Sequence, residues 1–151
     1  MKIKFMPLSD LAIMPKKGTT GSAAYDVYTP ESRIVQRGRQ IIPLDFAIEI
    51  PYGYEAKIEP RSGFSSKGME GLDSENNTMR FNCDVIQGKI DSDYRGNVGV
   101  IVNNQDIDFL VPRKTRIAQL TIYKVEDVKF EVVEELTNTE RNNGGFGSTG
   151  K

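Results

Sequence analysis

The chain has 151 residues, with 20 Lys and Arg, 21 Asp and Glu, and a formal net charge of −1. This length favours a single domain with a substantial core. The near balance of charge gives no electrostatic reason to expect a nucleic-acid or membrane partner. The sequence contains no histidine, which excludes every mechanism that needs an imidazole base or an imidazole zinc ligand.

Cys83 is the only cysteine, so the chain cannot form an internal disulfide or a cysteine cluster for a metal. The apolar N-terminal stretch is interrupted by Pro7, Asp10 and Pro15, and no later stretch reaches membrane-spanning length. We therefore expect neither a signal peptide nor a membrane segment, and we expect a cytoplasmic location.

Apolar residues at every second position are the main pattern along the chain. This spacing predicts half-buried strands of an antiparallel sheet. The first such run, over residues 43–50, places Leu44, Phe46, Ile48 and Ile50 on one face. The later runs cover residues 54–60, 97–104 and 116–125.

Helical patterns are short, and the loops are polar. One or two helical turns are predicted over residues 62–69, after Pro60, and loops are predicted over residues 14–22 and 68–78. The tail from Thr137 onward is polar and rich in Gly and Asn, so it cannot form its own core. These features predict an all-β protein, a jelly-roll-like β-barrel with a flexible C-terminal arm, whose edge strands favour a closed oligomer.

The stretch GKIDSDYRGN, residues 88–97, carries the most chemical information. Asp91 and Asp93 are two residues apart and therefore share one face of an extended strand, with Tyr94 on the other face. A carboxylate that faces a pocket can align and deprotonate a water, and a tyrosine ring can support a sugar or a base. The alternative interpretation is a charged, solvent-exposed hairpin.

Three further stretches contain candidate binding residues. Arg61, Ser62 and Gly63 follow a predicted strand, in a position where a guanidinium and the first amides of a helix bind anions. The alternative there is a Ser-capped turn with a solvated arginine. Asp26 lies among small residues and Gln119 lies within an apolar strand, and each also fits an ordinary structural role.

The C-terminal sequence RNNGGFGSTGK, residues 141–151, contains the G-x-x-x-x-G-K spacing of a phosphate-binding loop. Such a loop lies between a parallel strand and a helix and continues with Ser or Thr. Neither feature is present and the strand pattern is antiparallel, so we do not expect a loop of that type. Backbone amides of these glycines can still bind phosphates, and Phe146 is unusual for a tail that serves only solubility.

In order and spacing, the stretches AAYDV, PRSG, GKIDSDYRGN, RIAQL and GGFGSTG resemble the five motifs of the homotrimeric deoxyuridine triphosphatases (dUTPases). The resemblance implies hydrolysis of dUTP to dUMP and pyrophosphate with Mg²⁺, which keeps uracil out of DNA and supplies dUMP for thymidylate synthesis. It implies a β-barrel domain over residues 1–136 and an arm over residues 137–151. It also implies three active sites, each built from all three chains.

The resemblance assigns the chemistry to two residues of the third motif. Asp91 would activate the water that attacks the α-phosphorus, and Tyr94 would pack under the deoxyribose and exclude a 2′-hydroxyl. Uracil would be held by the backbone of the preceding hairpin, at Val85, Gly88, Lys89 and Ile90. The second motif would bind phosphate oxygens through Arg61, Ser62 and Gly63.

The first, fourth and fifth motifs complete the implied site. Asp26 and Gln119 would hold waters on Mg²⁺, which is itself chelated by the triphosphate. The tail of a neighbouring subunit would close over the nucleotide as a lid. In that lid Arg141 would bind the γ-phosphate, Phe146 would stack on uracil, and the phosphates would be lined by Gly147 and Ser148.

The sequence departs from the family pattern in three places. Ala24 and Asn142 stand where the family usually has glycine, although Asn tolerates left-handed backbone angles better than most residues. The spacer over residues 68–82 is longer than expected between the second and third motifs, and the sequence assigns it no role.

Two rival functions remain open. Deoxycytidine triphosphate deaminases resemble this chain in two motifs, but they need a Glu in the strand after the hairpin, and residues 97–104 contain no carboxylate. The second rival is a non-enzymatic trimer that binds dUTP to regulate a partner, and the intact Asp91 argues against it.

Overall fold

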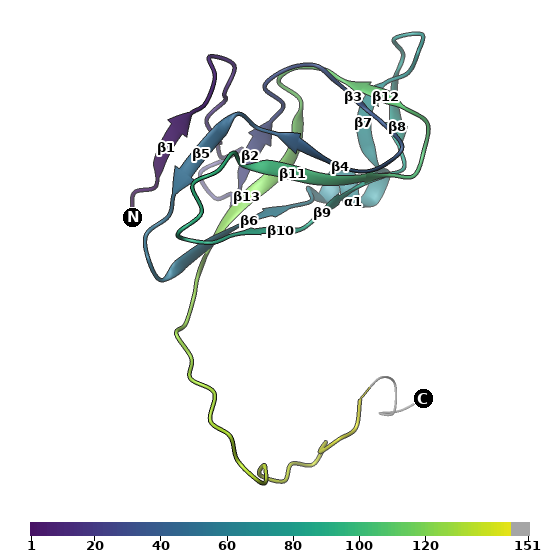
Figure 1. The fold of residues 1–151 in the computed structure, drawn as a ribbon. Coiled ribbons are helices and arrows are strands. Elements are labelled where there is room, and N and C mark those ends of the chain that lie inside the picture. Colours follow the sequence, from purple (N-terminus) through teal and green to yellow (C-terminus); the bar gives the residue numbers. More distant parts are fainter. Residues whose placement is uncertain (146–151) are drawn as a thin grey trace.

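A computed structural model describes residues 1–145, and within this range the chain is all-β, as predicted, with one short helix (Figure 1). All the strand pairings of these residues are antiparallel. The elements in chain order are β1 (Lys4–Pro7), β2 (Tyr25–Tyr28), β3 (Arg33–Val35), β4 (Gly38–Pro43), β5 (Phe46–Glu49), β6 (Tyr54–Glu59), α1 (Ser62–Lys67), β7 (Met69–Leu72), β8 (Thr78–Phe81), β9 (Cys83–Ile86), β10 (Gly88–Ile90), β11 (Gly99–Asn104), β12 (Phe109–Val111) and β13 (Arg116–Lys124).

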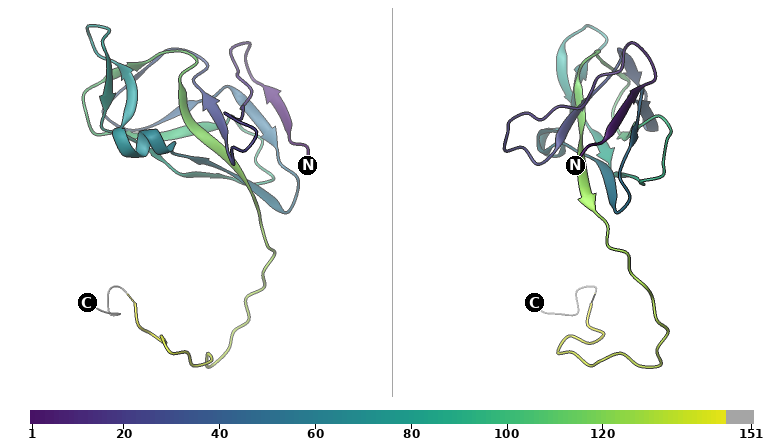
Figure 2. Two further views of the ribbon diagram at one scale, coloured as in Figure 1. Left: turned by 180° about the vertical axis from the view of Figure 1, so that it is seen from behind. Right: turned by 90° about the vertical axis from the view of Figure 1, so that its left-hand side faces the viewer.

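The strands form four sheets, with the orders β1-β5, β10-β6-β13-β2, β4-β11-β9 and β3-β12-β7-β8. Figure 2 shows from two further sides how these sheets surround one interior. A single cluster of buried apolar side chains fills that interior. The jelly-roll arrangement and the trimer remain predictions.

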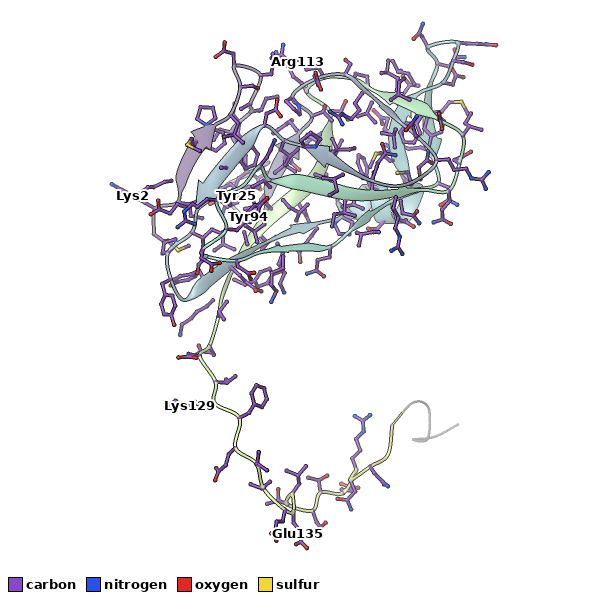
Figure 3. All side chains as sticks on the ribbon, in the orientation of Figure 1. Lys2, Tyr25, Tyr94, Arg113, Lys129 and Glu135 are labelled. Carbon is purple, nitrogen blue, oxygen red and sulfur yellow. The ribbon has the colours of Figure 1, made fainter. Side chains whose placement is uncertain are left out.

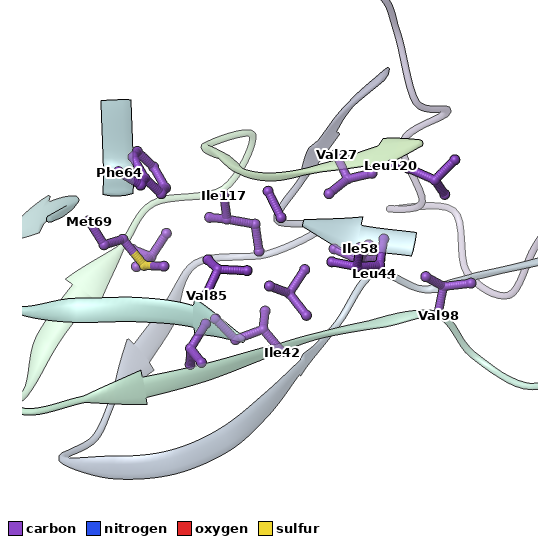
Figure 4. Packing of buried hydrophobic residues seen from close by; sticks show 14 of the residues in the cluster. Val27, Ile42, Leu44, Ile58, Phe64, Met69, Val85, Val98, Ile117 and Leu120 are labelled. Carbon is purple, nitrogen blue, oxygen red and sulfur yellow. The ribbon is translucent and has the colours of Figure 1, made fainter. Parts of the chain in front are cut away.

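The core follows the predicted alternation. Val98, Val100 and Val102 are each at most 1% exposed, and Leu44 is fully buried. Figure 4 shows Leu44, Ile58 and Val98, from three segments far apart in the sequence, close together in the interior. Full burial of each aliphatic side chain contributes about 1.5–3 kcal/mol, so these positions account for much of the drive to form the barrel.

Glu55 is an exception to the alternation, because the pattern predicts a solvent-facing residue and the structure buries it to 8% exposure. Its carboxylate lies 2.6 Å from Lys89 Nζ and 3.4 Å from Lys57 Nζ. The hydrogen bond from Lys89 holds the pKa of Glu55 below its ordinary value. The two lysines therefore compensate for the burial of this charge.

The predicted short helix is confirmed as α1. The chain is extended at Arg61, with φ −80° and ψ 142°, and the helix ends at Gly68, whose φ of 80° favours glycine. A six-residue helix is not stable alone, and Phe64 anchors this one through a side chain only 6% exposed. No helix among residues 1–145 is long and apolar enough to cross a membrane.

The prediction of a loop over residues 68–78 was wrong, because most of this segment forms the β7–β8 hairpin. Its polar composition hid a short alternation in which Met69 and Gly71 are buried while Glu70 is exposed. Phe81, in β8, stacks on Phe109 with ring centroids 4.1 Å apart and joins the hairpin to the core.

Residues 125–145 contain neither helix nor strand, and they run away from the barrel after β13 (Figures 1 and 2). Figure 3 shows the side chains of Lys129 and Glu135 on this segment, outside the barrel. Phe130 is 99% exposed and Val132 is fully exposed. The proposed boundary between the barrel domain and the arm, at residue 137, stays a prediction.

Cys83 lies in β9 with 1% of its surface exposed. Burial raises the pKa of its thiol to about 12, and the nearby Asp84 carboxylate adds to this effect. The thiolate is the reactive form of cysteine, so this side chain acts as a small apolar core residue.

Replacing Gly71 tests the packing of the hairpin on the core. A Cβ at this position would overlap the ring of Phe109 and lie 3.0 Å from the carbonyl oxygen of Leu110. We therefore expect Gly71→Ala to lower the free energy of unfolding by about 1–3 kcal/mol, which is typical of overpacking. Urea denaturation measures this change. Gly21→Ala is the control, since nothing lies within 4 Å of its added Cβ, and equal midpoints for the two variants would contradict the packing.

Candidate functional site

Two separate pockets on the sheet β10-β6-β13-β2 are lined in part by predicted site residues. The larger pocket, of about 510 Å³, lies where β2, β6 and β13 meet the start of α1. Its lining includes predicted residues from three motifs that are far apart in the sequence, namely Asp26, Arg61, Ser62, Gly63 and Gln119. We call it the phosphate-side pocket.

Strand register brings the polar side chains of this pocket together. Gln119, on β13, lies opposite Asp26 on one side and opposite Glu59 on the other. Directly paired residues project from the same face of a sheet. The neighbouring residues Ala118 and Leu120 are buried, so the two-residue period of β13 directs Gln119 toward the pocket.

Asp26 joins two arginines at this pocket. Its carboxylate lies 3.0 Å from Nε of Arg61 and 3.4 Å from Nη1 of Arg116. The Asp26 side chain is only 14% exposed, and a carboxylate this buried needs a charged partner. Glu59 also lines this pocket, so two carboxylates balance the two guanidinium groups. Guanidinium groups nevertheless suit a phosphate ligand, because they donate paired hydrogen bonds to its oxygens.

The remaining predicted groups of the pocket are available to a ligand. Gln119 donates its amide N–H to the carbonyl oxygen of Pro60 at 3.1 Å, which leaves the amide oxygen free. Ser62 and Gly63 are exposed in the first turn of α1, where backbone N–H groups have no partner within the helix.

Sequence reasoning missed several other residues of this pocket, among them Glu59, Arg116, Thr121 and Tyr123. Arg116 begins the RIAQL motif, three residues before Gln119, and its place in this motif was the available signal. Thr121 and Tyr123 donate hydrogen bonds to Glu59, at 2.8 and 3.1 Å. The bond to Glu59 raises the pKa of Tyr123 above its ordinary value.

Asp91 lies in a different, smaller pocket of about 270 Å³, lined also by Tyr54, Glu55, Lys89 and Ser92. It directly follows β10 and is exposed. The turn after Asp91 is closed through the backbone, because the N–H of Tyr94 donates to the Asp91 carbonyl oxygen at 3.2 Å. The Asp91 carboxylate takes no part in this hydrogen bond.

The prediction of a hairpin over the segment that carries Val85, Gly88, Lys89 and Ile90 was wrong, because β9 pairs with β11 and β10 pairs with β6, in two different sheets. Only Gln87 separates β9 from β10, which is too short for the chain to turn back on itself. Val85 and Ile90 are each 7% exposed, with their side chains in the core. Gly88 has no side chain, and Lys89 is held at 2.6 Å by Glu55. That these four positions act through their backbone stays a prediction.

Tyr94 is 46% exposed, and its hydroxyl donates to the carbonyl oxygen of Asn97 at 3.1 Å. A side chain at position 96 would collide with the hydroxyl end of the Tyr94 ring. Gly96 therefore allows the ring to occupy this position. Arg95 donates to the carbonyl oxygens of Ser92 and Tyr94, at 2.7 and 2.9 Å. Arg95 therefore stabilises the turn, in line with a structural role.

The two pockets are far apart within one chain. β2 and β10 are the two edges of the sheet, with β6 and β13 between them. Asp26 is level with Glu59, whereas Asp91 follows Ile90, which pairs with Ala56. With strands about 4.8 Å apart and a rise of about 3.3 Å per residue, Asp26 and Asp91 are separated by about 20 Å.

The fifth motif is only partly described. Arg141 is exposed, and its Nε donates to the carbonyl oxygen of Gly144 at 2.8 Å. Asn142 has a φ of 42°, which bears out the expectation that Asn accepts a left-handed conformation there. The predicted residues Phe146, Gly147 and Ser148 lie outside the described residues.

Among residues 1–145, no group of three or more Cys, Asp and Glu side chains is arranged to hold a metal ion. Asp26 and Gln119 are nevertheless adjacent across two strands. A carboxylate and an amide oxygen in this position suit hydrogen bonds to the waters of a hard cation.

Comparisons with known proteins agree with this arrangement. A sequence model of the dUTPase family matches residues 10–150. The deoxyuridine 5′-triphosphate nucleotidohydrolase of Arabidopsis thaliana is 42% identical over 149 residues, covering 97% of this chain and 82% of the relative. The enzyme of the same name from Nautilia profundicola is 39% identical over 154 residues and covers 100% of both chains.

Solved structures give the same result. The dUTPase of Staphylococcus bacteriophage 80alpha, solved with dUPNHPP, superposes with a TM-score of 0.84 at 26% identity, covering 99% of each chain. A family model over most of the chain, relatives near 40% identity and a shared fold lead to one conclusion. The chain belongs to the dUTPase family.

Proposed function

We propose that this chain hydrolyses dUTP to dUMP and pyrophosphate with Mg²⁺, in active sites that form only where copies of the chain meet in a homotrimer. The observation that carries the proposal is the separation of about 20 Å between Asp26 and Asp91 in one chain. The names of the relatives and the dUPNHPP bound to the phage enzyme support the substrate.

The separation matters because both ends of the site must act on the same triphosphate. A general base acts on a water within about 2.6–3.2 Å, so Asp91 must lie beside the phosphorus that the water attacks. The sheet is continuously hydrogen-bonded between the two pockets and cannot fold one edge onto the other. A second copy must therefore bring its Asp91 to the phosphate-side pocket of the first.

In this arrangement Arg61, Ser62 and Gly63 bind phosphate oxygens through a guanidinium, a hydroxyl and backbone N–H groups. Arg116 adds a second guanidinium at 3.4 Å from Asp26. A preorganised donor of this kind contributes about a hundredfold to a thousandfold in rate when it faces charge that develops in the transition state.

The pocket also suits a bound magnesium ion. Mg²⁺ prefers oxygen ligands and retains several waters, and Asp26 and Gln119 can accept hydrogen bonds from those waters. Because Asp26 is already paired with two arginines, it fits this outer role better than direct coordination. When bound to the triphosphate, the ion neutralises charge on the phosphate oxygens.

The segment formed by β9 and β10 would hold uracil through its backbone, and the ring of Tyr94 would pack against the deoxyribose. The Asp91 carboxylate would then orient a water and take its proton as the water attacks the α-phosphorus, releasing pyrophosphate. The tail of another copy would close over the nucleotide, with Arg141 and Phe146 as its contacts. Closure that excludes water and fixes the in-line geometry favours phosphoryl transfer.

The proposed reaction also has a cellular consequence. It would lower the concentration of dUTP available for DNA synthesis and supply dUMP for thymidylate synthesis.

The first experiment tests activity. We expect the protein with Mg²⁺ to release pyrophosphate from dUTP, with dCTP, dTTP and UTP far poorer. Asp91→Asn should lower kcat by about 10²–10⁴-fold, since it removes the general base and keeps the shape. Asp93→Asn is the matched control from the same motif and should change kcat little. Release of ammonia from dCTP would instead indicate a deaminase, and binding of dUTP without turnover a regulatory protein.

The second experiment tests whether sites are shared between chains. Arg61→Ala and Asp91→Asn should each abolish turnover, since each removes one half of the site. After denaturation and refolding together in equal amounts, random trimers should recover about a quarter of the wild-type rate, because one site in four combines intact halves. The control mixes each variant with itself. A mixture as inactive as the controls would contradict a site shared between chains.

The third experiment tests the tail. Deleting residues 142–151 should lower kcat/KM for dUTP by at least about tenfold, because contacts that order the triphosphate are lost. The elution volume on a sizing column should not change, since residues 125–145 lie outside the barrel. An unchanged kcat/KM would contradict the proposal that the tail closes over the nucleotide as a lid.

A further inference from the structure

The β7–β8 hairpin, to which neither the sequence nor the proposed reaction assigns a role, contacts the C-terminal end of α1. The N–H of Gly68 donates to the carbonyl oxygen of Phe64 at 2.8 Å and closes the helix. A Cβ on Gly68 would overlap the carbonyl group of Phe81. Strand β8 therefore approaches the helix end as closely as a glycine allows.

Arg80, on β8, makes two contacts with α1 and its cap and one with the neighbouring strand β7. Its Nη1 donates to the carbonyl oxygen of Gly68 at 3.2 Å, and its Nη2 lies 2.8 Å from the carboxylate of Glu70. Its guanidinium also lies 5.8 Å from the ring centroid of Phe64, within the range of a cation–π contact.

Arg61 contacts the same aromatic ring. Its guanidinium lies 5.5 Å from the Phe64 centroid, while its Nε is paired with Asp26 at 3.0 Å. Figure 4 shows Phe64 directed from α1 into the interior, toward Met69 and Ile117. The ring is thus fixed by the core and lies between a guanidinium of the phosphate-side pocket and a guanidinium of the hairpin.

We propose that the β7–β8 hairpin positions α1 for phosphate binding, and that Arg80 is the positioning residue. This inference rests on the proposed function. A helix of six residues has no stable position of its own, so its orientation depends on what holds its two ends. Asp26 holds the first end through Arg61, and Arg80 holds the last through Gly68.

Arg80 acts on position more than on overall stability. The Arg80 and Glu70 side chains are 42% and 50% exposed, and exposed ion pairs contribute little to the free energy of folding. Contacts to phosphate are more sensitive to position, because hydrogen bonds weaken steeply when they lengthen or bend. In catalysis, a displacement of about 1 Å can cost up to about a hundredfold in rate.

The test replaces Arg80 by Met, which keeps the aliphatic chain and removes the guanidinium, and by Lys, which keeps the charge. We expect Arg80→Met to weaken binding of dUPNHPP by about tenfold. The affinity of Arg80→Lys should lie between those of the wild type and Arg80→Met. Binding of deoxyuridine, which has no phosphate, should change less than twofold, and the Tm by less than about 3 °C. A general loss of structure would instead lower the affinities for dUPNHPP and deoxyuridine together.

Arg33→Met is the matched control, because Arg33 lies in the same sheet and is paired with an exposed Glu31 at 3.1 Å without contacting α1. It should bind dUPNHPP as wild type does. Equal affinities of Arg80→Met and Arg33→Met for dUPNHPP would overturn the inference.

Hydrogen exchange tests the same inference without a nucleotide. The amides of Phe64, Ser65 and Gly68 are hydrogen-bonded within α1 or its cap, and looser helix ends open more often. We expect these amides to exchange at least about threefold faster in Arg80→Met than in Arg33→Met. If the wild type fails to bind dUPNHPP, the proposed function fails, and unchanged exchange would separately refute the positioning role.

Discussion

The antiparallel register of β10, β6, β13 and β2 is the constraint on which the other functional features depend. It gives each strand a polar face and a buried face, and it fixes which side chains form the polar row. It also keeps the two edges of the sheet apart, since closing them would break the ladder of backbone hydrogen bonds. If the proposed site uses both Asp26 and Asp91, the same ladder would prevent one chain from completing it.

Charge pairing along this face determines which groups are available to a ligand. Glu55 is buried between Lys57 and Lys89, and Asp26 is held by Arg61 and Arg116. In both clusters two cations surround one carboxylate. The phosphate-side cluster lines an open pocket of about 510 Å³, so its two guanidinium groups can bind an anion there. A complex of a triphosphate with a cation would satisfy Asp26 and the arginines at the same time.

The sequence predicted the all-β class and the main strands because apolar residues such as Val98, Val100 and Val102 repeat every second residue. It also identified some of the residues that line each pocket, among them Asp26, Arg61 and Asp91, through motifs that local spacing makes recognisable. It missed the β7–β8 hairpin, whose pairing depends on contacts with Phe109 that a polar stretch does not reveal. It could not place Asp91 away from Asp26, because that distance follows from strand order, which no local pattern contains.

The burial of Cys83 limits how copies of this protein can associate. The sequence offers one sulfhydryl group, and that group is enclosed in the barrel with its pKa raised to about 12. At neutral pH it exists almost entirely in the protonated form, which neither exchanges with disulfides nor attacks oxidants readily. Folded chains are therefore not expected to be joined by a disulfide through this residue, and their association should be insensitive to reducing agents.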